Sequence, residues 1–136
     1  MTETQPERDA LITTVRSRLA ERPEIEFVFL HGSFLSGERY HDIDIAVWID
    51  PSVVPATEWG RYALDLGVAL SAAARASVDV QVLNGASLAF RYHAQKGRLL
   101  LARDPETVAD FRARTWDEYF DFLPFARQYL REALRG

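Results

Sequence analysis

The segment from residue 42 to residue 49, DIDIAVWI, constrains the fold more than any other part of the sequence. Side chains of a strand point alternately to its two faces, so the branched residues at odd positions form one continuous apolar face. The opposite face has Asp42 and Asp44 at one end, although aspartate is a poor strand former and neighbouring carboxylates repel each other. We therefore predict a sheet whose buried face lies opposite a cluster of carboxylates.

Hydrophobic periodicity predicts further elements on both sides of this strand. Strands are expected at 25–31, 42–49, 78–83 and 98–102, and helices at about 7–22, 59–73, 86–96 and from 105 onward. Thr57 is expected to cap the second helix, and Asp104 the last one. Pro124 is expected to bend or break that last helix.

The spacing of these elements indicates how the strands pair. The loop between the first two strands is too short for a crossover, so they are expected to be antiparallel neighbours. A helix precedes the third strand and is long enough for a parallel crossover. The expected class is α/β, in the α+β sense, with a mixed sheet of three to four strands packed with helices. At 136 residues the chain is expected to be one domain, 1–136, with a helical C-terminal segment from about 105.

The third predicted strand repeats the pattern of the second. Its valines at 78, 80 and 82 face one way and Asp79 faces the other way. If both branched faces share one core, Asp79 lies on the same side as Asp42 and Asp44. Carboxylate oxygens are the ligands that Mg²⁺ prefers, and three carboxylates could hold two ions that support phosphoryl transfer.

A phosphate site is predicted beside these carboxylates. Gly32 and Ser33 follow the first strand, and free backbone N–H groups at such a turn can bind phosphate. An antiparallel pairing of the first two strands places this turn next to Asp42 and Asp44.

The order strand, Gly-Ser, loop, Asp-x-Asp, strand resembles the signature of the DNA polymerase β nucleotidyltransferase superfamily. The small size, the segment SVDVQVLN and the following LAFRYHAQKGRLLLARDPE resemble its minimal nucleotidyltransferase (MNT) branch. The resemblance covers about residues 25–106. It implies a polymerase-β-like fold and the transfer of a nucleoside monophosphate, expected to be AMP from ATP, to a hydroxyl with the help of two Mg²⁺ ions.

The resemblance also implies residue roles and a partner. Gly32 and Ser33 would hold the triphosphate, Asp42 and Asp44 would bind both ions, and Asp79 would bind the catalytic ion and meet the acceptor oxygen. Many MNT proteins are antitoxins that transfer AMP to a helical HEPN-type toxin, so we expect a protein adenylyltransferase of that kind.

Two other functions remain open. The loop between Ser33 and Asp42 reads FLSGERYH, and Arg39 is its only arginine, whereas this loop in the family usually has several. The chain could therefore be a non-catalytic antitoxin that masks its partner. It could also be a small-molecule nucleotidyltransferase that another subunit completes.

The C-terminal segment is a candidate interface. Seven of the sixteen aromatic residues lie between Phe111 and Tyr129, more than one packed stripe needs. The partner there is expected to be a HEPN-type subunit or a second copy of the chain. His31 and His41 are open between a role at the site and a structural one, and His93 is assigned to the surface or to packing.

Composition excludes several classes. A net charge of −4 argues against binding duplex nucleic acid, and the absence of cysteine excludes disulfides, thiolate metal sites and cysteine nucleophiles. No apolar run is long enough to span a membrane, and the N-terminus is not a signal peptide. We expect a cytoplasmic protein.

Overall fold

The computed structural model describes residues 4–37 and 40–135. Its centre is a four-stranded sheet in the order β3-β2-β1-β4. The strands are β1 (Ile25–His31), β2 (Ile43–Ile49), β3 (Val78–Val82) and β4 (Arg98–Ala102). β1 is antiparallel to both β2 and β4, whereas β2 and β3 are parallel. The predicted mixed sheet and the predicted pairing of the first two strands are confirmed.

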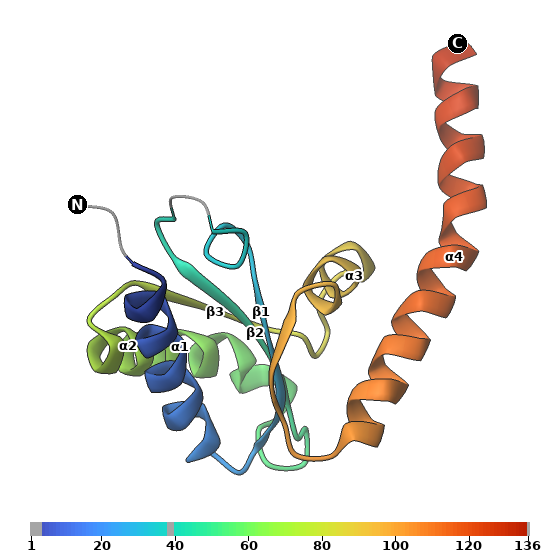
Figure 1. Cartoon of the computed structure of the whole chain (residues 1–136). Coiled ribbons are helices and arrows are strands. Elements are labelled where there is room, and N and C mark those ends of the chain that lie inside the picture. The colour runs from blue at the N-terminus through green and yellow to red at the C-terminus, as the bar shows by residue number, and fades with distance from the viewer. Residues whose placement is uncertain (1–3, 38–39, 136) are drawn as a thin grey trace.

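Helices cover both faces of this sheet. They are α1 (Gln5–Ala20), α2 (Trp59–Ala74), α3 (Leu88–Gln95) and α4 (Pro105–Arg135), and a short 3₁₀ helix, η1 (Ala56–Glu58), precedes α2. Figure 1 shows α1 and α2 on one side of the sheet and α3 and α4 on the other. We call these the α1/α2 layer and the α3/α4 layer.

The alternation of side chains along the strands divides the core between the two layers. The branched face of β2, with the valines of β3, packs against Leu66 and Leu70 of α2 and Val15 and Leu19 of α1. The opposite face forms a smaller cluster, which contains Phe27, Phe29, Ala46, Leu83, Ala94, Val108 and Phe111. The α3/α4 face is left uncovered at β3, where Asp79 and Gln81 are exposed, so this part of the sheet is open to polar chemistry.

One expectation about helix ends is wrong, and a second is wrong in part. Thr57 lies inside η1 instead of capping α2, and the residue before α2 is Glu58, whose side chain makes no capping hydrogen bond. Pro124 lies inside α4 without breaking it, while a bend at Pro124 stays a prediction. Because Pro124 is exposed, the carbonyl of Phe120 that loses its helical partner can be hydrogen-bonded by water instead. The predicted cap at Asp104 is confirmed, since its carboxylate accepts from the Glu106 amide at 3.0 Å.

The two halves of α4 have different surroundings. Its buried residues are Val108, Phe111 and Thr115, all in the first half. The second half extends away from the rest of the molecule (Figure 1). Among the described residues, no helix has the length and apolarity that a membrane crossing requires.

Candidate active site

The candidate site is a row of polar side chains across three adjacent strands. Asp44 on β2 is in register with Asp79 on parallel β3 and with His31 on antiparallel β1. Residues in register point to the same face of a sheet, so these three side chains all lie on the α3/α4 face. The predicted placement of Asp44 and Asp79 on one side is confirmed. Asp79 is exposed and Asp44 is half-buried, so the row opens to solvent at β3.

Asp42 lies beside this row, two residues before Asp44, and we call Asp42, Asp44 and Asp79 together the acidic row. It precedes β2, which begins at Ile43 and not at residue 42 as expected. The Ser77 hydroxyl donates a hydrogen bond to the Asp42 carboxylate, and the Ile43 amide donates to the Ser77 carbonyl at 2.8 Å. The start of β3 therefore holds Asp42 beside the start of β2.

The charges of the neighbouring carboxylates affect the pKa of Asp44. Burial raises the pKa of the Asp44 carboxyl, and the charges of Asp79 and Asp42 raise it further, in that order. The imidazole of His93 acts in the opposite direction on the same pKa. A cation bound beside Asp44 would therefore relieve this unfavourable burial and repulsion of its charge.

Gly32 packs directly against Asp44. Its φ of +82° is a backbone conformation that glycine adopts without strain, and a Cβ atom there would collide with the Asp44 carboxylate. Ser33 begins the following turn, and its carbonyl accepts from the Ser36 hydroxyl at 2.9 Å. The structure therefore places the predicted phosphate turn in contact with one of the predicted metal carboxylates, Asp44.

The loop after this turn is held by α1. The Arg8 guanidinium donates to the Phe34 carbonyl at 3.0 Å and lies 5.0 Å from the ring centres of both Phe34 and Tyr40. These two rings meet edge to face at 4.7 Å. Arg39, the one arginine of the loop sequence, lies outside the described residues. An arginine from α1 is thus next to a loop that is poor in arginine.

Two histidines lie closer to the carboxylates than the sequence indicated. The ring of His31 is buried and packs edge to face against Phe90 and His93 of α3, each at 5.5 Å. Burial and His93 lower the pKa of His31, while Asp79 acts to raise it. The expectation that His93 is on the surface is confirmed, but its proximity to His31 and Asp44 was missed. The alternation Phe27, Phe29, His31 could have placed His31 on the Asp44 face. His41 is exposed.

The residues fit a hard divalent cation by donor chemistry. Asp42, Asp44 and Asp79 offer carboxylate oxygens from the adjoining ends of two strands, and the raised pKa of Asp44 shows that the three charges affect one another. Within residues 4–37 and 40–135, no three His, Cys, Asp or Glu side chains are already gathered to hold one ion. The metal-binding roles of these residues, and the phosphate-binding roles of Gly32 and Ser33, stay predictions.

Solved structures share this architecture. A toxin–antitoxin structure of MntA and HepT matches over 98% of this chain and 100% of the other, with 21% identity and a TM-score of 0.65. A tri-AMPylated HEPN toxin from Shewanella oneidensis in complex with MNT antitoxin matches over 97% and 98%, with 22% identity and a TM-score of 0.65. A toxin–antitoxin structure with AMP-PNP matches over 95% and 98%, with 22% identity and a TM-score of 0.69.

Identities this low show a shared fold, and the expected polymerase-β-like fold is confirmed. The comparison with curated proteins gives no match. The family model "Polymerase beta, Nucleotidyltransferase" matches residues 13–106, which include every strand of the sheet and the whole acidic row. Because that match spans most of the sequence, the chain belongs to the polymerase β nucleotidyltransferase family.

Proposed function

We propose that the protein is a Mg²⁺-dependent nucleotidyltransferase that moves AMP from ATP to a hydroxyl of a helical HEPN-type partner protein. One observation supports this more than any other: Asp44 is in register with Asp79 and in contact with the Gly32 turn. A carboxylate pair and a phosphate-binding turn are the two parts that phosphoryl transfer needs at one place.

In this proposal, each of the predicted site residues has a separate role. Gly32 and Ser33 bind the triphosphate, and Asp42, Asp44 and Asp79 hold the ions. When bound, Mg²⁺ would lower the pKa of the acceptor hydroxyl and neutralise charge on the transferred group.

The proposed reaction is a displacement at phosphorus. The acceptor oxygen forms a bond to the α-phosphorus of ATP, the bond from that phosphorus to the pyrophosphate oxygen breaks, and pyrophosphate leaves. The hydroxyl proton passes to the carboxylate of Asp79, which is exposed on the open side of the row, and then to water.

The relatives support AMP and a HEPN-type acceptor. One of the structures with this fold contains a tri-AMPylated HEPN toxin with its MNT antitoxin, and another contains AMP-PNP. These ligands and partners belong to those proteins. Their shared fold with this chain, over nearly its whole length, makes the same donor and the same class of acceptor the first to test.

The second half of α4 is the proposed docking surface for that partner. Six of its large apolar side chains are more than half exposed: Phe120, Phe122, Phe125, Tyr129, Leu130 and Leu134. Phe125 and Leu134 are two and a half helical turns apart, so they point to opposite sides of the helix. One flat surface cannot cover both sides, whereas a groove between helices of a partner can.

Labelled ATP provides the test of transfer. The chain is incubated with labelled ATP and Mg²⁺, with and without a purified helical HEPN-type protein. Label is expected on the partner, and the double variant Asp42→Asn with Asp44→Asn is expected to reduce it to background. Asp50→Asn, at the opposite end of β2, is the matched control and should transfer label normally. Absence of label with every triphosphate would contradict the enzymatic proposal.

Binding is tested separately from transfer. Phe125→Ser with Tyr129→Ser is expected to abolish co-elution with the partner, while Arg127→Ser with Arg131→Ser, on the opposite and polar side of the same helix, should leave co-elution intact. If the Asp42 and Asp44 double variant still neutralises the partner, the masking function holds and the transfer function does not. If the chain elutes as a dimer that the aromatic changes dissociate, α4 joins two copies instead.

A further inference from the structure

One side chain outside the acidic row is hydrogen-bonded to it. The Ser77 hydroxyl donates to Oδ1 of Asp42, and no other side chain among the described residues makes a hydrogen bond to any of the three carboxylates. Asp42 precedes β2 and has no pairing partner in the sheet, whereas Asp44 is paired on both sides. The orientation of the Asp42 carboxylate therefore depends on Ser77.

The backbone around Ser77 is itself held by hydrogen bonds. The Ser77 carbonyl accepts from the Ile43 amide at 2.8 Å, which joins the start of β3 to the start of β2. The Ser71 hydroxyl of α2 accepts from the Val78 amide at 2.9 Å, and the Ser71 carbonyl accepts from the Ala76 amide at 3.3 Å. Because the residues on both sides are fixed, only rotation about the Cα–Cβ bond of Ser77 sets the position of its hydroxyl oxygen.

The hydrogen bond leaves half of the Asp42 carboxylate available to another ligand. A carboxylate accepts through two oxygens, and Ser77 contacts only Oδ1, while Oδ2 makes no hydrogen bond with any part of the chain that the structure describes. Burial, Asp79 and Asp42 together raise the pKa of Asp44, so Asp42 lies within electrostatic reach of the row. Carboxylates that bind metal ions are commonly held in this way by a hydrogen bond from a second group.

A second serine–aspartate pair in the chain provides a comparison. At the opposite end of β2, Asp50 accepts from the Ser52 hydroxyl at 2.7 Å and from the Ser52 amide at 2.9 Å. These partners are two residues apart, so their contact belongs to a local turn. Ser77 and Asp42 are 35 residues apart and lie at the starts of different strands. Their contact is therefore made by the tertiary fold and is directed at the candidate site.

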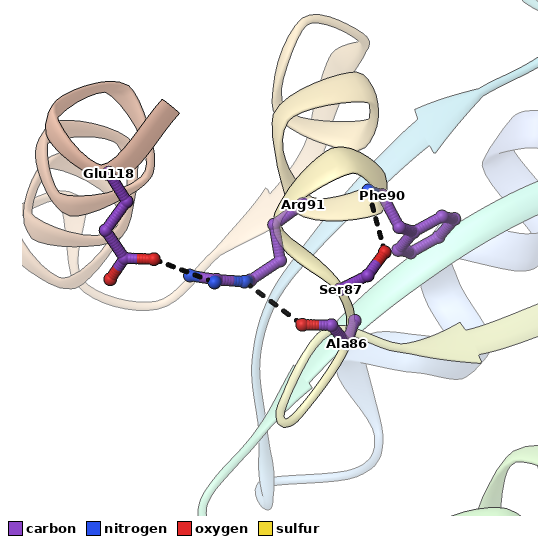
Figure 2. A network of polar contacts seen from close by, with 5 residues as sticks. All are labelled: Ala86, Ser87, Phe90, Arg91 and Glu118. Carbon is purple, nitrogen blue, oxygen red and sulfur yellow. Dashed lines mark hydrogen bonds and ion pairs between the residues drawn. The ribbon is translucent and has the colours of Figure 1, made fainter. Parts of the chain in front are cut away.

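The α3 side of the row is fixed by contacts that do not involve its carboxylates. Figure 2 shows Arg91 of α3 between Glu118 of α4 and the Ala86 carbonyl. The Arg91 guanidinium pairs with Glu118 at 2.8 Å and donates to Ala86 at 3.2 Å. This network holds α3 in place, but it leaves the orientation of Asp42 to Ser77.

We propose that Ser77 is a positioning residue for the divalent cation, because its hydroxyl holds Oδ1 of Asp42 and keeps Oδ2 available to the ion. This role rests on the proposed binding of a divalent cation at the acidic row, but not on which group is transferred or to which acceptor. Loss of the hydroxyl would free the carboxylate to rotate, and the rotation would have to be stopped each time the ion binds.

Titration with Mn²⁺, which prefers the same oxygen ligands as Mg²⁺, tests this role on the whole chain. Free Mn²⁺ is followed by electron paramagnetic resonance, without nucleotide or partner protein. Ser77→Ala is expected to weaken Mn²⁺ binding about tenfold, the lower end of the loss found when a group that orients a metal ligand is removed. Ser77→Thr keeps the hydroxyl and is expected to restore the original affinity. Ser52→Ala, which removes the matching hydroxyl at the other end of β2, should leave the affinity unchanged.

A measurement without metal separates positioning from stability. Ser77 is exposed, so Ser77→Ala is expected to leave the thermal midpoint unchanged. The three-bond couplings of the Asp42 β-protons, measured by NMR, are expected to change from those of one rotamer to an average over several.

Three results would overturn the role of Ser77 and leave the proposed nucleotidyl transfer standing. They are equal Mn²⁺ affinity in Ser77→Ala, equal losses in Ser77→Ala and Ser77→Thr, and Asp42 couplings that do not change in Ser77→Ala. Absence of Mn²⁺ binding by the unaltered chain would overturn both proposals. Failure of AMP transfer by a chain that binds Mn²⁺ and loses affinity in Ser77→Ala would refute the transfer alone.

Discussion

The two layers of the molecule differ in the polarity of their buried side chains. The α1/α2 layer is an apolar core in which branched side chains of all four strands meet those of two helices. The α3/α4 layer contains the acidic row and the two histidines. Among the residues that the structure describes, every buried side-chain nitrogen or oxygen without a partner belongs to this second layer: His31 Nε2, Gln95 Nε2, Arg112 Nε and Thr115 Oγ1.

The difference shows that one layer contributes most of the stability, whereas the other contains the candidate functional groups. A filled apolar layer stabilises the sheet without any ligand. A layer with unpaired buried polar atoms is less stable than one in which every such atom has a partner. The α1/α2 layer therefore supports the sheet whose other face is available for binding.

The largest expected effect tests the α1/α2 layer. Leu66→Ala, at a fully buried position of α2, is expected to lower the free energy of unfolding by about 2–5 kcal/mol because it leaves a cavity in the core. Leu64→Ala on the same helix is the control, since Leu64 is 69% exposed, and it should change stability by less than about 0.5 kcal/mol. Urea denaturation measures both. Equal effects of the two changes would contradict the role given to this layer.

A smaller effect is expected where the chain passes between the layers. The buried Asn84 side chain accepts from the Ile49 amide at 2.9 Å and donates to the Ile49 carbonyl at 2.8 Å, so it completes the end of β2. Asn84→Ala leaves both backbone groups unpaired and is expected to cost about 1–3 kcal/mol. Gln128→Ala removes an exposed amide and should have little effect on the same urea curve. No loss in Asn84→Ala would show that water replaces the side chain.

The acidic row is expected to reduce stability when no divalent ion is present. The pKa of Asp44 is raised in the folded protein, so the folded state keeps its proton to a higher pH than the unfolded chain does. Stability therefore falls as the pH rises from the ordinary carboxyl value through the raised one. Asp44→Asn is expected to remove this fall and to increase the thermal midpoint at pH 7 in EDTA.

Asp50→Asn is the control for that experiment, and the opposite sign is expected. Asp50 accepts hydrogen bonds from the Ser52 amide at 2.9 Å and the Ser52 hydroxyl at 2.7 Å, which lower its pKa. Its contribution is present above the ordinary carboxyl pKa and is lost as the pH falls through the lowered value. Midpoints that move in the same direction in both variants at pH 7 would disprove the electrostatic account of the row.

The smallest effect is expected at the ion pair between α3 and α4. Glu118→Gln removes a pair whose side chains are 21% and 52% exposed, and it is expected to cost at most about 1 kcal/mol. Its clearer consequence should be faster amide hydrogen exchange in α4, measured by mass spectrometry. Asp65→Asn removes the more exposed pair with Arg61, 3.8 Å long, and should leave exchange in α4 unchanged.

Much of the fold and half of the site could be read from local pattern. Strict alternation in DIDIAVWI and VDVQV places the branched residues of both strands on one face, and the short loop after His31 requires an antiparallel neighbour. Together they place Asp44 beside the Gly32 turn. Thr57 and Pro124 were misread because hydrogen bonding around a helix end or a proline depends on exposure and on neighbouring turns, which local residue preference does not contain.

The sequence by itself determined the strands, their faces and the family, because alternation and the Gly-Ser and Asp-x-Asp spacing are properties of neighbours along the chain. Only the tertiary structure decided which distant groups meet. It brought His93 of α3 to His31, placed Arg8 of α1 over the loop after Ser33, and brought the Ser77 hydroxyl to Asp42. These tertiary contacts depend on how the helices pack on the sheet, and that packing depends on the shape of the whole core.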